Sequence, residues 1–173
     1  LDDNKASLLT NAESLRALGV EIGGLADDLR TGIVEDSFAD VQVILTSLSS
    51  DGSTPLDILA IVGASAALTI SDVPFGGPVG AVRVGRVDGK FVFNPTYEEM
   101  ENSDVDLRVA GTKDAVLMVE CDASEVEESV LVQAVEGGHR ALQALVDLQE
   151  EMRQAVGKPK REYISHTLPD EVR

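Results

Sequence analysis

The chain has 173 residues, of which 43% are hydrophobic and 26% charged, so it is long enough for one domain with its own core. Its formal net charge is −17, which argues against a nucleic-acid-binding surface because phosphate backbones bind through lysine and arginine. The longest apolar run, 56–70, has 15 residues and is shorter than the ~20 that span a bilayer.

Leucine and alanine spacing of three and four residues predicts helical structure over 5–31, interrupted by Gly19 and the pair at 23–24. The segment 41–48 is β-branched and aliphatic and predicts a strand. A polar loop, 49–54, follows it. A buried helix is then expected to run from Pro55 to Ile70, with Thr54 as its N-cap and Pro55 at its first position.

A turn is predicted at 74–78, and two strands at 79–87 and 91–93 are expected to form a hairpin. Asp88-Gly89 between them is a type I′ turn signal. The glycines at 76–80 do not form a nucleotide-binding loop, because no strand leads through them into a helix.

A short acidic helix is predicted at 97–103, followed by a second hairpin with strands at 106–111 and 116–121. The last helix is expected to start near Ser124, with Glu127 completing a capping box, and to end at Gly157 and Pro159. The pair Gly137-Gly138 inside it indicates a close helix crossing or a kink. Its apolar stripe is predicted to contain Val126, Val130, Ala134, Ala141, Leu145, Leu148 and Met152.

This order of elements predicts an α+β sandwich of helices on a mixed sheet. Three segments are expected: a helical N-terminal segment of 1–40, a globular part of 41–157 and a tail or linker of 158–173. No signal peptide is recognised, because the N-terminus is acidic and lacks an apolar run, and a reducing cytoplasm suits a chain with one cysteine. We interpret Cys121 as a half-buried structural thiol and His139 as a surface or packing residue.

Acidic residues are concentrated in 95–129, where eleven carboxylates face only Arg108 and Lys113, a local net charge of −9. Solubility explains such a surface, and an acidic face for a metal or a basic partner is the alternative. Within it, Glu98 and Asp104 lie six residues apart near a strand end, where two carboxylates could hold Mg²⁺ or act as acid and base.

Four motifs in fixed order carry a family resemblance: GASAALT at 63–69, VPFGGPVGAVRVG at 73–85, NPT at 94–96 and DLRVAGT at 106–112. Together they resemble an RNase PH-like core of the polynucleotide phosphorylase family, over roughly 41–165. The resemblance implies an RNase PH-like fold of the ribosomal protein S5 domain 2-like kind, present in part. It also implies phosphorolytic 3′-to-5′ RNA degradation, Mg²⁺ and assembly of three chains into a ring.

The resemblance is to the first, non-catalytic core of that family. The phosphate-binding serines of the catalytic core fall at about Pro55 and Leu56, which have no hydroxyl. Two catalytic carboxylates would correspond to Glu98 and Asp104, whereas NPT at 94–96 is typical of the first core. Residues 1–40 show no resemblance and lack the arginine-rich segments that contact RNA.

We therefore expect a non-catalytic structural and assembly core of a phosphorolytic exoribonuclease, self-associating and binding RNA weakly or not at all. The first alternative is a stand-alone or engineered structural or interaction protein that reuses the fold without RNA activity. The second is a module that presents its acidic 95–129 surface to a basic partner. A sheet face left open by half a sandwich is expected to be covered by residues 1–40 or by oligomerisation.

Overall fold

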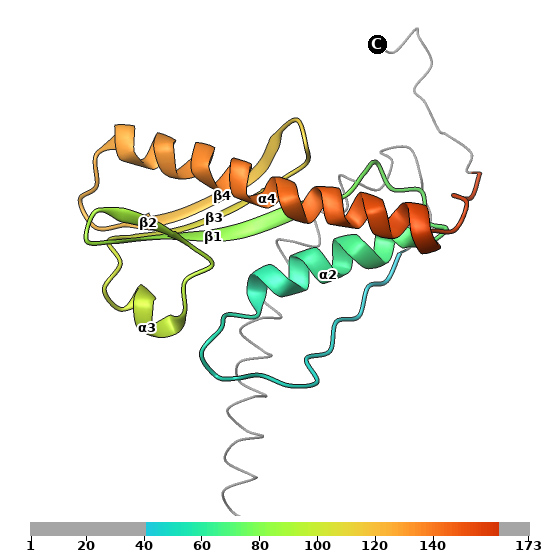
Figure 1. Cartoon of the computed structure of the whole chain (residues 1–173), viewed down its shortest axis with the longest axis horizontal. Coiled ribbons are helices and arrows are strands. Elements are labelled where there is room, and N and C mark those ends of the chain that lie inside the picture. Colours follow the sequence, from blue (N-terminus) through green and yellow to red (C-terminus); the bar gives the residue numbers. More distant parts are fainter. Residues whose placement is uncertain (1–40, 163–173) are drawn as a thin grey trace, which may run out of the picture.

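The computed structural model describes residues 41–162, and their elements form one layer of sheet with helices on it (Figure 1). Four strands pair in the order β2-β1-β3-β4. In chain order the elements are α2 (Asp57–Ile70), β1 (Gly80–Val87), β2 (Lys90–Phe93), α3 (Tyr97–Met100), β3 (Val105–Gly111), β4 (Val116–Ala123) and α4 (Glu128–Val156). The predicted helices of 5–31 lie outside the described residues.

Both predicted hairpins are confirmed, and all three strand pairs are antiparallel. Asp88 and Gly89 have φ values of 50° and 75°, the left-handed pair that a type I′ turn requires. The predicted mixed sheet is wrong within 41–162, because all three pairs are antiparallel: two are hairpins, and the chain returns through α3 from β2 to place β3 on the other side of β1. The acidic helix is confirmed as α3, and Thr96 and Glu99 form its capping box.

The segment 41–48 is not a strand, although its composition predicts one. A strand needs a neighbour for its backbone hydrogen bonds, and no described strand pairs with this segment. It runs as an extended trace alongside α2 (Figure 1). Ile44 and Leu48 are 76% and 94% exposed, so composition alone did not bury it.

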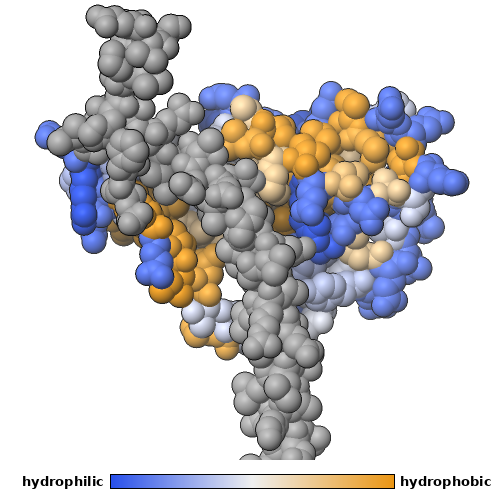
Figure 2. All heavy atoms as spheres, turned by 180° about the vertical axis from the view of Figure 1, so that it is seen from behind, coloured by the Kyte–Doolittle hydropathy of each residue, from blue (hydrophilic) through white to orange (hydrophobic). Residues whose placement is uncertain are grey.

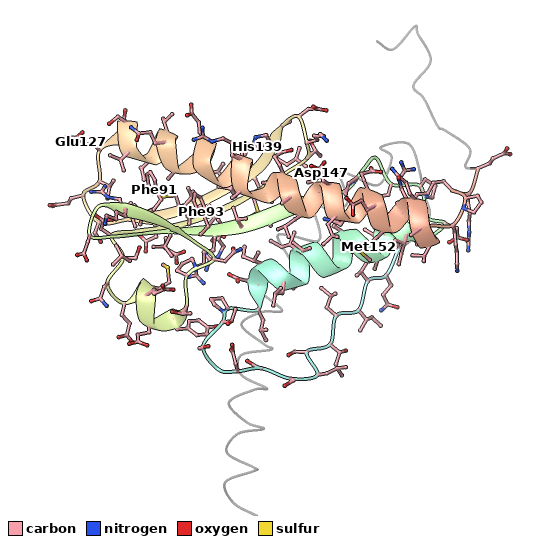
Figure 3. All side chains as sticks on the ribbon, viewed as in Figure 1. Phe91, Phe93, Glu127, His139, Asp147 and Met152 are labelled. Atoms are coloured by element: carbon pink, nitrogen blue, oxygen red, sulfur yellow. The ribbon has the colours of Figure 1, made fainter. Side chains whose placement is uncertain are left out.

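One face of the sheet packs against α4. Alternation along β1 and β3 places Val84, Leu107 and Val109 on this face, where they contact Leu142 and Val146 of the helix. Phe91 and Phe93 extend from β2 below the N-terminal half of α4 (Figure 3). The close contact at Gly138 is with the sheet and not with another helix as predicted, since a Cβ on Gly138 would lie 3.0 Å from Val109 Cγ2 of β3.

The predicted apolar stripe of α4 is correct in part. Ala134 is fully buried, but Leu148 is 53% exposed and Met152 37% exposed. The buried positions are Ala134, Gly138, Leu142, Val146 and Gln149. Apolar residues occupy two neighbouring stripes of this helix, and packing against the sheet buries only one of them.

The predicted starts of α2 and α4 are wrong. The N-cap of α2 is Leu56 and not Thr54, whose backbone N–H and hydroxyl are bonded to Asp51. The last helix begins at Glu128 and not near Ser124, because Glu125 has a φ of 53°, outside helical geometry. The side chain of Glu127 makes no capping hydrogen bond, whereas the predicted end at Gly157 is confirmed.

A buried hydrogen-bond network joins α2, α4 and the start of β1. Ser65 Oγ donates to Gln149 Oε1 at 2.7 Å and accepts from the backbone N–H of Val79 at 2.8 Å. Gln149 Nε2 donates in turn to the carbonyl oxygen of Val79 at 3.0 Å. Ser65 is 0% and Gln149 2% exposed, so the helices meet through satisfied polar groups.

The segment after α4 folds back onto the end of α2. Lys160 Nζ donates to the carbonyl oxygens of Leu68, Thr69 and Ser71 at 2.8–3.1 Å. These carbonyls have no partner within the last turn of a helix, so the ammonium acts as a C-cap. The first residues of the predicted tail are therefore held against α2. No helix within 41–162 is both long and apolar enough to cross a membrane.

Candidate functional site

Charged side chains cluster on the face of the sheet opposite α4. Strand alternation places Arg83 of β1 and Asp106 and Arg108 of β3 on this face, with Arg83 directly opposite Arg108 in the pairing register. Asp57 joins them from the first turn of α2. Because α2 covers this face beside the cluster, through Ile58 and its neighbours, the four side chains are only 11–27% exposed.

The cluster is a connected ion network. Arg83 donates from Nε to Asp106 Oδ1 at 2.7 Å and from Nη2 to Oδ2 at 2.5 Å, a bidentate pair. Arg108 Nε donates to Asp57 Oδ2 at 3.0 Å, and Arg83 Nη1 lies 3.6 Å from the same oxygen. Arg108 Nη1 also lies 3.6 Å from Glu120 Oε2 on β4.

The electrostatics of this cluster favour charge neutralisation. The hydrogen bonds that Arg83 donates to Asp106 raise the pKa of the Arg83 guanidinium, and nearby Asp57 acts in the same direction. A partly buried guanidinium needs a carboxylate partner, and each arginine here has one from another segment of the chain. The ion pair between Asp57 and Arg108 therefore links α2 to the sheet, and carboxylates of the same chain neutralise the positive charges of both arginines.

The start of α2 carries a carboxylate and no hydroxyl. Pro55 is buried, Leu56 is the N-cap without a side-chain capping bond, and Asp57 Oδ1 accepts from the backbone N–H of Ile58 at 2.8 Å. Asp57 thus places its negative charge at the helix N-terminus, where the helix dipole favours an anion. The same carboxylate also accepts from Arg108.

The two predicted metal-binding carboxylates have different surroundings. Glu98 is exposed in the first turn of α3. Asp104 directly precedes β3, and its Oδ2 lies 3.5 Å from Arg86 Nη2, while its Oδ1 is buried without a hydrogen-bond partner. Residues 41–162 contain no group of three or more His, Cys, Asp or Glu side chains that could hold a metal ion. Two carboxylates with a guanidinium beside one do not fit a Mg²⁺ site, which needs several oxygen ligands.

Cys121 and His139 take no part in this cluster of charges. Cys121 is exposed on β4 and not half-buried as predicted. Desolvation by neighbouring atoms, and then the charges of Asp106 and Asp122, raise the pKa of the thiol, which disfavours a nucleophilic thiolate. His139 is half-buried on α4, with Nε2 3.1 Å from the carbonyl oxygen of Thr112 in the β3–β4 turn (Figure 3). It is the packing residue that the sequence predicts.

Sequence reasoning missed the network of Asp57, Arg83, Asp106 and Arg108. One local signal was present. Asp106 and Arg108 alternate with valine and leucine in 105–109, so they share the face of the strand opposite to its apolar side chains. Nothing in the sequence pairs that face with Asp57, which lies 51 residues before Arg108.

Comparison with known proteins agrees with this fold. Residues 77–141 match the 3' exoribonuclease family, domain 2. The chain is 52% identical over 134 residues to a polyribonucleotide nucleotidyltransferase of Sorangium cellulosum, covering 78% of this chain and 18% of the relative. It is 55% identical over 123 residues to that of Heliobacterium modesticaldum (71% and 17%) and 50% over 133 residues to that of Thermus thermophilus (76% and 19%).

Among solved structures, the chain is similar to rice Rrp46, with a TM-score of 0.53, 17% sequence identity and coverage of 60% of this chain and 50% of that one. At this identity the likeness concerns the fold, which is α+β and RNase PH-like, present in part. The chain spans less than a fifth of the length of these three curated relatives.

Proposed function

The chain belongs to the polyribonucleotide nucleotidyltransferase family, and we propose that it serves as a non-catalytic assembly core of a 3′-to-5′ phosphorolytic exoribonuclease. The observation that carries the proposal is the neutralisation of Arg83 and Arg108 by Asp57 and Asp106. A phosphorolytic site has to bind inorganic phosphate and an RNA backbone, both of which need cations or hydroxyls that are free to contact them.

The start of α2 supports the same proposal. Pro55 and Leu56 stand at the positions where the resemblance places phosphate-binding hydroxyls, and neither can donate from its side chain. Asp57 adds a carboxylate that repels phosphate. A net charge of −17 over the whole chain works in the same direction.

We infer that assembly, and not chemistry, is the role of this core in the family's enzyme. Self-association of the chain, as a trimer or as part of a ring, is the form that the resemblance implies. Exposed apolar side chains of α4, namely Leu148, Met152 and Val156, support an assembly role, because exposed apolar positions are usual at interfaces. The Mg²⁺ ligands Glu98 and Asp104 stay a prediction that the surroundings of Asp104 disfavour.

Phosphorolysis of poly(A) by the purified chain tests the proposal, with and without phosphate and Mg²⁺. We expect no release of nucleoside diphosphate and no retention on poly(A) at physiological salt. Phosphate-dependent release that Asp104→Asn abolishes and Glu101→Gln leaves intact would assign catalysis to this core and overturn the proposal. The native mass of the same sample reports on assembly independently of activity.

A further inference from the structure

β4 is the outer strand of the sheet, and its far side pairs with no other described strand. Seven of its eight residues are exposed. Leu117 and Val119 are 51% and 50% exposed, and Val116 is 38% exposed. An edge that presents unpaired backbone N–H and C=O groups together with apolar side chains is a template for another strand.

The position of α4 leaves β4 uncovered. The helix packs on β1, β3 and β2, because a helix about 10 Å wide covers roughly two strands spaced about 4.8 Å apart. His139 of α4 contacts Thr112 beside β4, and Val132, two helical turns earlier on the same flank, is 57% exposed. Apolar surface gathers at the sheet end of the molecule in the view from behind (Figure 2).

The two faces of β4 differ in chemistry. Pairing with β3 sets Val119 opposite Val109 and Cys121 opposite Leu107, both on the α4 face. The same register sets Glu120 opposite Arg108 and Asp122 opposite Asp106, on the charged face. From Val119 to Asp122, β4 therefore alternates between side chains on the α4 face and acidic side chains on the charged face, whereas 116–118 is apolar throughout; the strand contains no lysine or arginine.

We propose that the outer edge of β4 binds an extended segment of a partner in which apolar and basic side chains alternate, adding it as a fifth strand. Directly opposed residues of neighbouring strands have Cβ atoms about 4.5–5.5 Å apart, so a fifth strand aligns one side-chain row with each face. Its apolar row covers Val119, and its basic row pairs with Glu120 and Asp122. Backbone hydrogen bonds hold the strand, as in other cases of strand addition.

Charge selects this occupant over a second copy of the chain. Two copies paired through β4 would bring together two surfaces from the 95–129 segment, each with a net charge of −9. A basic strand instead gains from that charge, and its attraction weakens with salt. The inference goes beyond the proposed assembly role, since it concerns a partner of different sequence and needs no RNA activity.

The test uses two capped hexapeptides, one alternating lysine and valine and one alternating glutamate and valine, titrated into the whole chain with backbone NMR shifts as readout. The lysine peptide is expected to shift β4 resonances and to bind at least roughly tenfold more tightly than the glutamate peptide, with affinity falling as salt rises. Glu120→Lys/Asp122→Lys is expected to lower that affinity roughly tenfold. The control Glu101→Lys/Glu151→Lys changes net charge equally away from β4 and should leave most of the affinity.

Equal binding of both peptides would overturn the proposal, because it would mean that charge does not select the strand. Equal loss of affinity in the two double variants would overturn it as well, because that result means non-specific charge attraction. Shifts confined to elements other than β4 would overturn it too. A dimer of the unliganded chain that Val119→Lys dissociates would assign the edge to a second copy instead. Native mass of each variant and its amide dispersion show that the chain remains folded, so a loss of binding is read at the edge itself.

Discussion

Replacing Ser65 by alanine is expected to destabilise the chain more than any other single hydroxyl deletion among residues 41–162. The substitution removes one atom that both donates to Gln149 and accepts from the backbone N–H of Val79. It leaves two buried polar groups without these partners in a site where Ser65 is 0% and Gln149 2% exposed.

The magnitude follows from those two groups. A buried donor or acceptor left unsatisfied costs about 1–3 kcal/mol, and the better helix propensity of alanine offsets roughly 0.5 kcal/mol. We therefore expect the free energy of unfolding to fall by about 1.5–5.5 kcal/mol. Urea denaturation followed by circular dichroism at 222 nm, compared at matched m-values, measures this difference.

Thr69 provides a matched control one turn further along α2. It is 2% exposed, and its Oγ1 has no hydrogen-bond partner among the residues that the structure describes. Thr69→Val keeps the shape and removes only that oxygen, so stability should be unchanged or rise by about 1 kcal/mol. If Ser65→Ala lost less than 1 kcal/mol, or Thr69→Val lost as much as Ser65→Ala, the account of the network would be wrong.

Three further predictions follow from contacts elsewhere in the chain. Gly138→Ala should lower the free energy of unfolding by about 1–3 kcal/mol in urea melts, because the added Cβ would lie 3.0 Å from Val109. Gly63→Ala, whose nearest neighbour would lie at 3.7 Å, should raise the free energy of unfolding by up to about 1 kcal/mol. Equal effects of the two substitutions would contradict the close contact between α4 and the sheet. Lys160→Met should speed amide exchange at 158–162 and trypsin cleavage after Arg161 severalfold without changing global stability. Unchanged exchange there would show that the cap contributes nothing. Hydrogen bonds from Thr54 and Ser53 hold the pKa of Asp51 well below 3.8. The carboxylate therefore stabilises the fold above about pH 4, and this contribution disappears as the pH falls towards the folded pKa. Asp51→Asn should reduce the pH dependence of the melting temperature in that window, and parallel pH profiles of variant and parent would refute the prediction.

Local sequence signals predicted those elements whose geometry depends on residues that are close together in the chain. The Asp88-Gly89 turn fixes its hairpin because both residues must adopt positive φ. The alternation in 105–109 and the apolar run of 116–121 mark two paired strands. Those patterns, with the four family motifs, were sufficient for the RNase PH-like fold.

Long-range packing decided the rest. The segment 41–48 has the composition of a strand, yet a strand exists only where another backbone pairs with it. Similarly, α4 carries two apolar stripes, and only contact with the sheet selects the one through Leu142 and Val146, leaving Leu148 exposed.

The candidate site divides in the same way. The family resemblance identified Pro55, Leu56, Glu98 and Asp104 as positions of interest, because the presence or absence of a hydroxyl or a carboxylate can be seen in the sequence. Whether a charge is free to act depends on what lies beside it in space, and the sequence contains no rule that brings Asp57 to Arg108 across 51 residues. Sequence thus determined the fold and the family, while the tertiary structure determined that the arginines of this face are matched by carboxylates, since ion pairing depends on distance and burial.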